Sequence, residues 1–179
     1  MDTPFTKYIK DNLKTEELIG AEIGVMEGVN ALYLLSNLPI KKLYLIDNYK
    51  TYFDGGTRTY PQEKIEMYYE VMLHAIEPYF EKTKVIRQDS VWATNLIPDG
   101  YLDFVYIDAG HSYDDVMSDM NAWWNKVKKG GVFGGHDYGT INGRQVYHAV
   151  NDFLEAHGIK QDPSIGMRVG EAMEWAIIK

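Results

Sequence analysis

Two acidic side chains and a histidine follow strongly apolar segments of the chain, where they could do chemistry. Asp108 closes the run 102–108, and His136 and Asp137 directly follow the run 132–135. Both runs carry the β-branched or aromatic residues of buried strands. Parallel strands end at one edge of a sheet, so we expect the three side chains to converge there. They are candidate ligands of a divalent metal, with Mg²⁺ or Ca²⁺ favoured by carboxylates and Mn²⁺, Fe²⁺, Co²⁺ or Zn²⁺ by an added imidazole.

His111 lies three residues after Asp108. Because the ordinary pKa of histidine is close to neutrality, His111 could add a ligand to this site or act as a general base. A loop histidine is more often only hydrogen-bonded, and that alternative stays open. Asp108 and His111 are the candidate catalytic residues.

A second polar group surrounds a glycine turn near the N-terminus. The strand 18–25 leads into the pattern Glu22-x-Gly24-x-x-Glu27-Gly28, which a helix follows. Glycines at such a turn let the backbone approach a ligand closely. The G-x-G-x-x-G spacing of dinucleotide sites is absent, and Glu27 would occupy the helix N-terminus that binds a phosphate. The acids therefore favour a cationic cofactor such as S-adenosylmethionine, whose ammonium Glu22 could offset; a glycine turn with no ligand is the alternative.

Acidic residues also end the next two predicted strands. Asp47 ends the segment 42–47, where a carboxylate can accept both hydroxyls of a ribose. Asp89 and Ser90 follow the segment 83–88 and could contact an adenine. Alternatively, one of the two simply caps the short helix that follows.

The elements that must position these residues alternate along the chain. Strand patterns at 18–25, 42–47, 83–88, 102–108 and 132–135 are separated by helical patterns, and a terminal hairpin follows at 164–169 and 173–178. This order predicts an α/β fold, with a mostly parallel, doubly wound sheet and an antiparallel edge. Residues 1–17 contain a predicted N-terminal cap helix, and the aromatic loop 48–60 is read as a lid, or else as a packed loop.

Composition excludes several functions. The 179 residues fit one domain, 1–179, and the net charge of −8 argues against nucleic acid as a partner. The absence of cysteine excludes disulfides and thiol chemistry. With no apolar run long enough for a membrane span and no signal-peptide pattern, we expect a cytoplasmic protein without membrane contact, and the aromatic loop makes a homodimer reasonable.

Three segments resemble class I S-adenosylmethionine-dependent methyltransferases: 21–28, the I-D-x-x-H-x-Y motif at 107–113, and the G-G-x-x-x-x-H-D-Y motif at 130–138. The resemblance extends to a small bacterial branch of this class that carries the latter two motifs. The resemblance implies a seven-stranded sheet of order 3-2-1-4-5-7-6 with strand 7 antiparallel. It also implies the cofactor contacts: the methionine moiety with Glu22, Gly24, Glu27 and Gly28, the ribose with Asp47, the adenine with Asp89 and Ser90, and Asp108 beside the cofactor.

Metal-dependent relatives, similar to catechol and macrolide sugar O-methyltransferases, place cation ligands at positions that match Asp108, His136 and Asp137. Those relatives have an acidic residue where this chain has His136. The departure puts Mg²⁺ in doubt and leaves open whether any metal binds; the candidate cations are Mg²⁺, Mn²⁺, Fe²⁺ and Zn²⁺.

The predicted function is O-methylation of a small hydroxylated acceptor by S-adenosylmethionine, assisted by a metal or by His111 as base. One alternative is a silent module that binds S-adenosylmethionine or adenosine. Another is a metal-dependent hydroxylase that uses Asp108, His111 and His136 as a two-histidine, one-carboxylate set.

Overall fold

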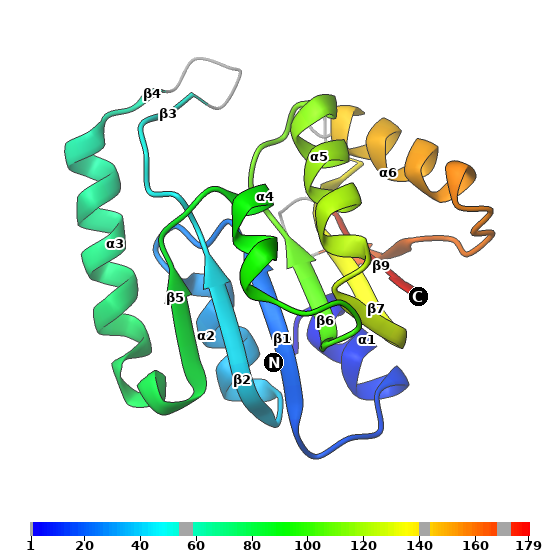
Figure 1. Ribbon diagram of the computed structural model, residues 1–179, viewed down its shortest axis with the longest axis horizontal. Coiled ribbons are helices and arrows are strands. Elements are labelled where there is room, and N and C mark those ends of the chain that lie inside the picture. Colours follow the sequence, from blue (N-terminus) through cyan, green and yellow to red (C-terminus); the bar gives the residue numbers. More distant parts are fainter. Residues whose placement is uncertain (1, 54–58, 140–143, 168–172) are drawn as a thin grey trace.

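A seven-stranded sheet forms the centre of the computed structural model, which describes residues 2–53, 59–139, 144–167 and 173–179 (Figure 1). The strands are β1 (Leu18–Ile23), β2 (Ile40–Ile46), β5 (Thr83–Ile86), β6 (Leu102–Ile107), β7 (Val127–Tyr138), β8 (Ser164–Met167) and β9 (Met173–Ile178). Their order across the sheet is β5-β2-β1-β6-β7-β9-β8. The first five pair in parallel, whereas β9 is antiparallel to both β7 and β8.

This architecture confirms the predicted fold class and the antiparallel C-terminal hairpin. Counted among the strands of this sheet alone, the order reads 3-2-1-4-5-7-6. The labels differ because two short strands, β3 (Tyr52–Phe53) and β4 (Thr59–Tyr60), form a separate antiparallel pair within the loop predicted as a lid. The lid prediction falls partly on residues 54–58, which lie outside the described residues.

The bounds of the strand expected at 132–135 were predicted wrongly. Strand β7 begins at Val127 and ends at Tyr138, so it includes His136 and Asp137, and the preceding helix ends at Trp124. Val127 pairs with Leu102 on β6. This pairing places Val127 in the sheet although its local sequence pattern is helical.

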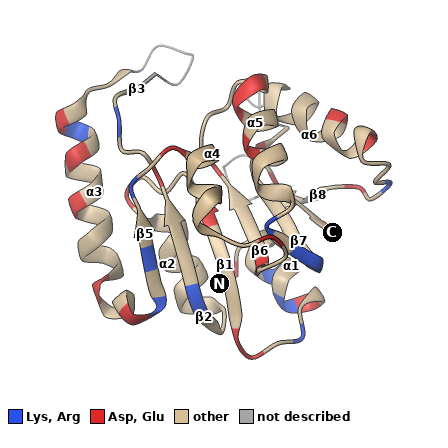
Figure 2. Cartoon of the chain, viewed as in Figure 1, with Lys and Arg blue, Asp and Glu red and all other residues tan. Residues whose placement is uncertain are grey.

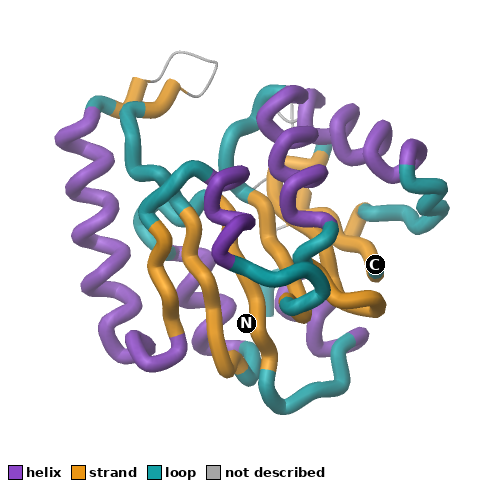
Figure 3. Tube along the Cα trace, viewed as in Figure 1, coloured by secondary structure: helices purple, strands orange, loops and turns teal. Residues whose placement is uncertain are grey.

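Helices cover both faces of the sheet (Figure 3). They are α1 (Pro4–Asn12), α2 (Val29–Asn37), α3 (Gln62–Ile76), α4 (Ser90–Ala93), α5 (Tyr113–Trp124) and α6 (Arg144–Ala156), with 3₁₀ turns η1 (Glu77–Lys82) and η2 (Thr94–Leu96). Of the described helices, none is long and apolar enough to cross a membrane.

Side chains along the central strands point alternately to the two faces of the sheet, and each face has its own hydrophobic core. On β6, Val105 and Ile107 join the core under α4, α5 and α6, whereas Phe104 and Tyr106 join the core under α1, α2 and α3. A strand buried on both faces in this way reads as a continuous apolar run. The parallel strands β1, β2, β5 and β6 end at one edge of the sheet, at the top in Figure 1, and the predicted site residues lie at or just after the ends of these strands in the chain.

A buried carboxylate fixes the start of α1. Glu174 on β9 is fully buried, and its two oxygens accept the Phe5 N–H at 2.7 Å and the Tyr106 hydroxyl at 3.2 Å. Gly134 on β7 makes the approach of Phe5 possible, because an added Cβ would lie 2.7 Å from the Phe5 ring. The helix is shorter than the predicted 1–17 segment and packs across β7, β8 and β9.

Replacing Glu174 with alanine should therefore lower the free energy of unfolding by roughly 2–4 kcal/mol, because two buried donors lose their acceptor. Urea unfolding of Glu174→Ala measures the loss. The matched control is Glu155→Ala, an exposed position on α6 that should change stability by less than about 0.5 kcal/mol. Similar unfolding midpoints for the two variants would contradict the assigned role of Glu174.

Candidate active site

The turn after β1 brings its backbone against the end of β6. Gly24 has φ +82° and Gly28 has φ +79°, a region that glycine enters without strain. An added Cβ on Gly24 would overlap the carbonyl oxygen of Asp108 and lie 2.8 Å from Cα of Ala109. Gly28 is the N-cap of α2, and an added Cβ there would lie 2.9 Å from the Met72 side chain. The turn therefore forms a cradle at the strand edge that side chains would fill.

Asp47 holds this turn from the end of β2. Its Oδ2 accepts the backbone N–H groups of Val25 at 2.9 Å and Met26 at 3.1 Å, and its Oδ1 accepts the N–H of Tyr49 at 2.8 Å. A ribose that bound to Asp47 would share these oxygens with the backbone. The Asp47 carboxylate therefore stabilises the conformation of the turn, a role that the sequence did not indicate.

Tyr49 is a second clamp that sequence reasoning missed. Its side chain is buried, its hydroxyl donates to the carbonyl of Met26 at 3.0 Å, and its φ is +47°. Burial, followed by the negative charges of Asp47 and Glu22, raises the pKa of the Tyr49 phenol well above its ordinary value. The phenol therefore stays neutral and keeps its donor. A tyrosine in an aromatic loop gives no sequence signal that separates this role from ordinary packing.

Acidic side chains line the inner side of the turn. Glu22 is buried and accepts a hydrogen bond from Asn30 Nδ2 on α2 at 3.3 Å, and Glu27 is half-buried within the turn itself. With Asp47, they give this edge of the sheet a negative potential. Such a potential favours a cationic ligand and opposes a phosphate.

The ends of β6 and β7 bring together Asp108, His111 and Asp137. His111 Nε2 lies 2.8 Å from Asp137 Oδ2 and 3.6 Å from Asp108 Oδ1. One ligand atom from each of the three residues lies within 4.8 Å of the other two, which fits a cluster that could hold a metal ion. Asp137 has φ +62°, a strained conformation for an acidic residue that here directs its carboxylate at His111.

Of the predicted set Asp108, His136 and Asp137, the two carboxylates share this cluster with His111, and His136 lies beside them. His136 Nδ1 lies 3.3 Å from Asp137 and 3.8 Å from Asp108, so the ring borders the cluster. Its Nε2 is buried and has no hydrogen-bond partner among the residues that the structure describes.

The two carboxylates decide the protonation of His111. Interactions with Asp108 and then Asp137 outweigh burial and raise the pKa of His111 to about 10. Burial favours the neutral form of Asp137, but His111 and His136 prevail and hold the pKa of Asp137 well below its usual range. Without a metal, these carboxylates favour the imidazolium form of His111 at neutral pH, which opposes the predicted role of general base.

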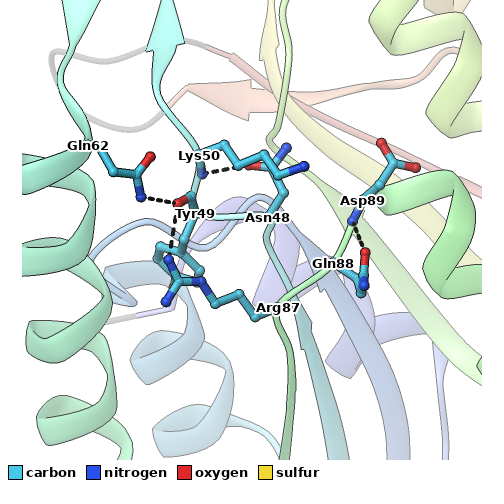
Figure 4. Close-up of a pocket in the computed structure, with 7 residues that line it drawn as sticks. All are labelled: Asn48, Tyr49, Lys50, Gln62, Arg87, Gln88 and Asp89. Atoms are coloured by element: carbon cyan, nitrogen blue, oxygen red, sulfur yellow. Dashed lines mark hydrogen bonds between the residues drawn. The ribbon is translucent and has the colours of Figure 1, made fainter.

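A polar pocket lies at the ends of β2 and β5 and reaches α3 (Figure 4). Its lining residues are Asn48, Tyr49, Lys50, Gln62, Arg87, Gln88 and Asp89. Gln62 Nε2 and an Arg87 nitrogen both donate to the carbonyl of Tyr49, and Arg87 pairs with Glu66. These contacts join α3 to both strand ends.

Asp89 and Ser90 have separate partners. Asp89 lines the pocket and caps α4, with Oδ1 accepting the Trp92 N–H at 3.0 Å. The Ser90 hydroxyl turns to α5, where it donates to Asp119 Oδ1 at 2.5 Å and accepts the Trp123 indole N–H at 2.9 Å. Asp119 also escaped sequence reasoning, although an acid between the apolar positions of a helix was a usable signal.

Burial, and then the nearby charges of Asp115 and Asp89, raise the pKa of Asp119 to about 6, although the Ser90 hydrogen bond opposes them. The folded protein then keeps a proton that the unfolded chain releases near pH 4, so stability falls as the pH rises from about 4 to 6. The loss amounts to at most roughly 3 kcal/mol. Urea unfolding at several pH values should show that Asp119→Asn gains stability relative to the original protein over this window. Parallel pH curves would contradict the shift.

A family model described as a methyltransferase domain matches residues 21–138, which include the glycine turn and the polar cluster. The chain belongs to this methyltransferase family. It is an S-adenosylmethionine-dependent enzyme with the class I fold, as predicted.

Solved structures support the methyltransferase fold at low identity. The O-methyltransferase NovP superposes with a TM-score of 0.66 at 16% identity, covering 97% of this chain and 76% of NovP. An rRNA methylase by provisional assignment, from Clostridium thermocellum, gives 0.65 at 13% identity, covering 97% of this chain and 94% of the other. Fibrillarin from Methanococcus jannaschii gives 0.64 at 14%, covering 92% and 67%. No curated protein matches the methyltransferase in sequence.

Proposed function

We propose that this methyltransferase transfers a methyl group from S-adenosylmethionine to a hydroxyl of a small acceptor, with a divalent cation at the strand ends. The observation that carries the proposal is the junction of two features. The Gly24 cradle packs against the backbone of Asp108, and the side chain of Asp108 belongs to the cluster with His111 and Asp137. A methyl donor held in the cradle would thus lie beside groups that can bind an acceptor oxygen.

The cofactor contacts follow the strand ends. We assign the methionine moiety to the turn and its acids, the ribose to Asp47 and the adenine to the pocket beside Asp89. The buried Glu22 and the half-buried Glu27 would offset the positive charges of the donor. Because the methyl group is already activated in S-adenosylmethionine, the protein must mainly supply position and a deprotonated acceptor.

The donor set fits a divalent cation. Two carboxylates, Asp108 and Asp137, and the imidazole of His111 would hold it, and a mixed oxygen and nitrogen set suits Mn²⁺, Fe²⁺ or Zn²⁺ as well as Mg²⁺. A bound cation would lower the pKa of an acceptor hydroxyl. Cation binding requires neutral His111, so it would displace the proton that Asp108 and Asp137 retain on the ring.

A small acceptor fits the charge distribution. Lys and Arg residues are spread over α1, α3, β2 and β5 in Figure 2, and the net charge is −8. A nucleic acid would require a concentrated basic surface. NovP, by its name, is an O-methyltransferase, which supports oxygen as the methylated atom.

The test is a transfer assay with isotopically labelled S-adenosylmethionine. The protein, stripped with a chelator and then given Mg²⁺, Mn²⁺, Fe²⁺ or Zn²⁺ in turn, is incubated with panels of phenols, sugars and hydroxy acids, and products are identified by mass spectrometry. We expect an O-methylated product that requires a cation. Equal turnover in the stripped enzyme would refute the metal role, and methylation at nitrogen or carbon would refute the acceptor class.

A further inference from the structure

A buried contact connects the helix beside the polar cluster with the loop beside the pocket. Helix α5 begins right after His111, with Ser112 as its N-cap. Farther along, Asp119 and Trp123 project from the same helix toward α4, which lies next to α5 in Figure 1. Helix α5 therefore begins beside the polar cluster and contacts Ser90, which is next to the pocket.

Ser90 is held from both sides by α5. Its hydroxyl donates to Asp119 and accepts from Trp123, so both of its hydrogen-bonding roles are used. Asp119 itself is only 6% exposed, and Trp123 is fully buried. Neither side chain lines the pocket, so their hydrogen bonds to Ser90 are the contacts by which they can affect its shape.

Ser90 directly follows Asp89, the residue that lines the pocket and caps α4. Helix α4 comprises only residues Ser90–Ala93, too short to fix its own position. The orientation of Asp89 toward the pocket therefore depends on how Ser90 is anchored.

We propose that Asp119 is a positioning residue for the adenine end of the cofactor, acting through Ser90 on the loop that carries Asp89. This inference rests on the proposed binding of S-adenosylmethionine. In this proposal, the buried Asp119 carboxylate changes the affinity for S-adenosylmethionine without contacting it. Its charged neighbours are Asp115 on the same helix and Asp89 on the loop, and both are acidic.

Calorimetry with S-adenosylmethionine and with adenosine alone tests the proposal. Asp119→Ala should weaken the binding of both ligands by about tenfold, because the contact acts at the part they share. Asp119→Asn, which can still accept the Ser90 hydroxyl, should restore binding to within about threefold. Asp114→Ala, an exposed acid on the first turn of α5, should bind as the original protein does.

Two results would overturn the positioning role: original affinity in folded Asp119→Ala, or a loss for S-adenosylmethionine without a loss for adenosine. If Asp119→Ala does not fold, Ser90→Ala removes the hydroxyl through which Asp119 is proposed to act. Unchanged affinities for both ligands in that variant would then overturn the role. Failure of the original protein to bind S-adenosylmethionine would instead refute the proposed function.

Discussion

Replacing Asp137 with alanine should lower kcat/KM for methyl transfer by about 100-fold or more and leave the affinity for S-adenosylmethionine within about threefold. Asp137 contributes the closest carboxylate to His111, at 2.8 Å, and a candidate metal ligand, whereas the glycine turn is built from other residues. The loss should therefore fall on the reaction and not on cofactor binding. Steady-state kinetics with an acceptor from the panel, together with calorimetry, separates the two effects.

The control for Asp137→Ala is Asp114→Ala, which removes an exposed acid near the same edge and should retain activity. The variant should also change the titration of His111. Without Asp137, one of the two carboxylates that raise the pKa of His111 is gone, so this pKa should fall from about 10. An NMR titration of the ring would detect the change. Full turnover by Asp137→Ala would remove this residue from the mechanism.

Replacing Gly24 with alanine should abolish measurable binding of S-adenosylmethionine and lower the free energy of unfolding by roughly 2–4 kcal/mol. Two costs combine at this position. The backbone has φ +82°, and the added Cβ would overlap the carbonyl of Asp108. To relieve the overlap, the turn and the end of β6 must separate, which opens the cradle.

Gly130 provides a matched control for the backbone term. It has the same φ of +82°, but no atom lies within 4 Å of an added Cβ. Gly130→Ala should therefore show only the cost of a left-handed residue, about 1–2 kcal/mol, and normal cofactor affinity. If the two alanine variants show the same loss of stability and the same cofactor affinity, the close approach of Gly24 to Asp108 is not required for cofactor binding.

The fold could be predicted from sequence because its signals are local and consistent. Apolar strands alternate with amphipathic helices, and each of the first four strands runs into a polar turn. The start of β7 was missed because Val127 follows directly on a helical pattern, and only its pairing with Leu102 assigns it to the sheet. Such long-range pairing is invisible in a local window.

The site was predictable at the level of strand ends but not of side-chain directions. The prediction that Asp108 and Asp137 lie at the same edge of the sheet was correct, because parallel strands end at the same edge. It could not indicate that the left-handed conformation of Asp137 turns its carboxylate to His111, or that His136 faces inward. The clamping roles of Asp47 and Tyr49 likewise depend on backbone amides whose directions no residue pattern encodes.

Calorimetric titration of the purified protein with S-adenosylmethionine and, separately, with NAD⁺ tests whether the glycine turn selects a cationic cofactor. The acidic residues at the glycine turn favour a cation and oppose a phosphate. We therefore expect saturable one-to-one binding of S-adenosylmethionine and no detectable heat from NAD⁺. Saturable binding of NAD⁺, with no binding of S-adenosylmethionine, would contradict the assignment of the glycine turn to a cationic cofactor.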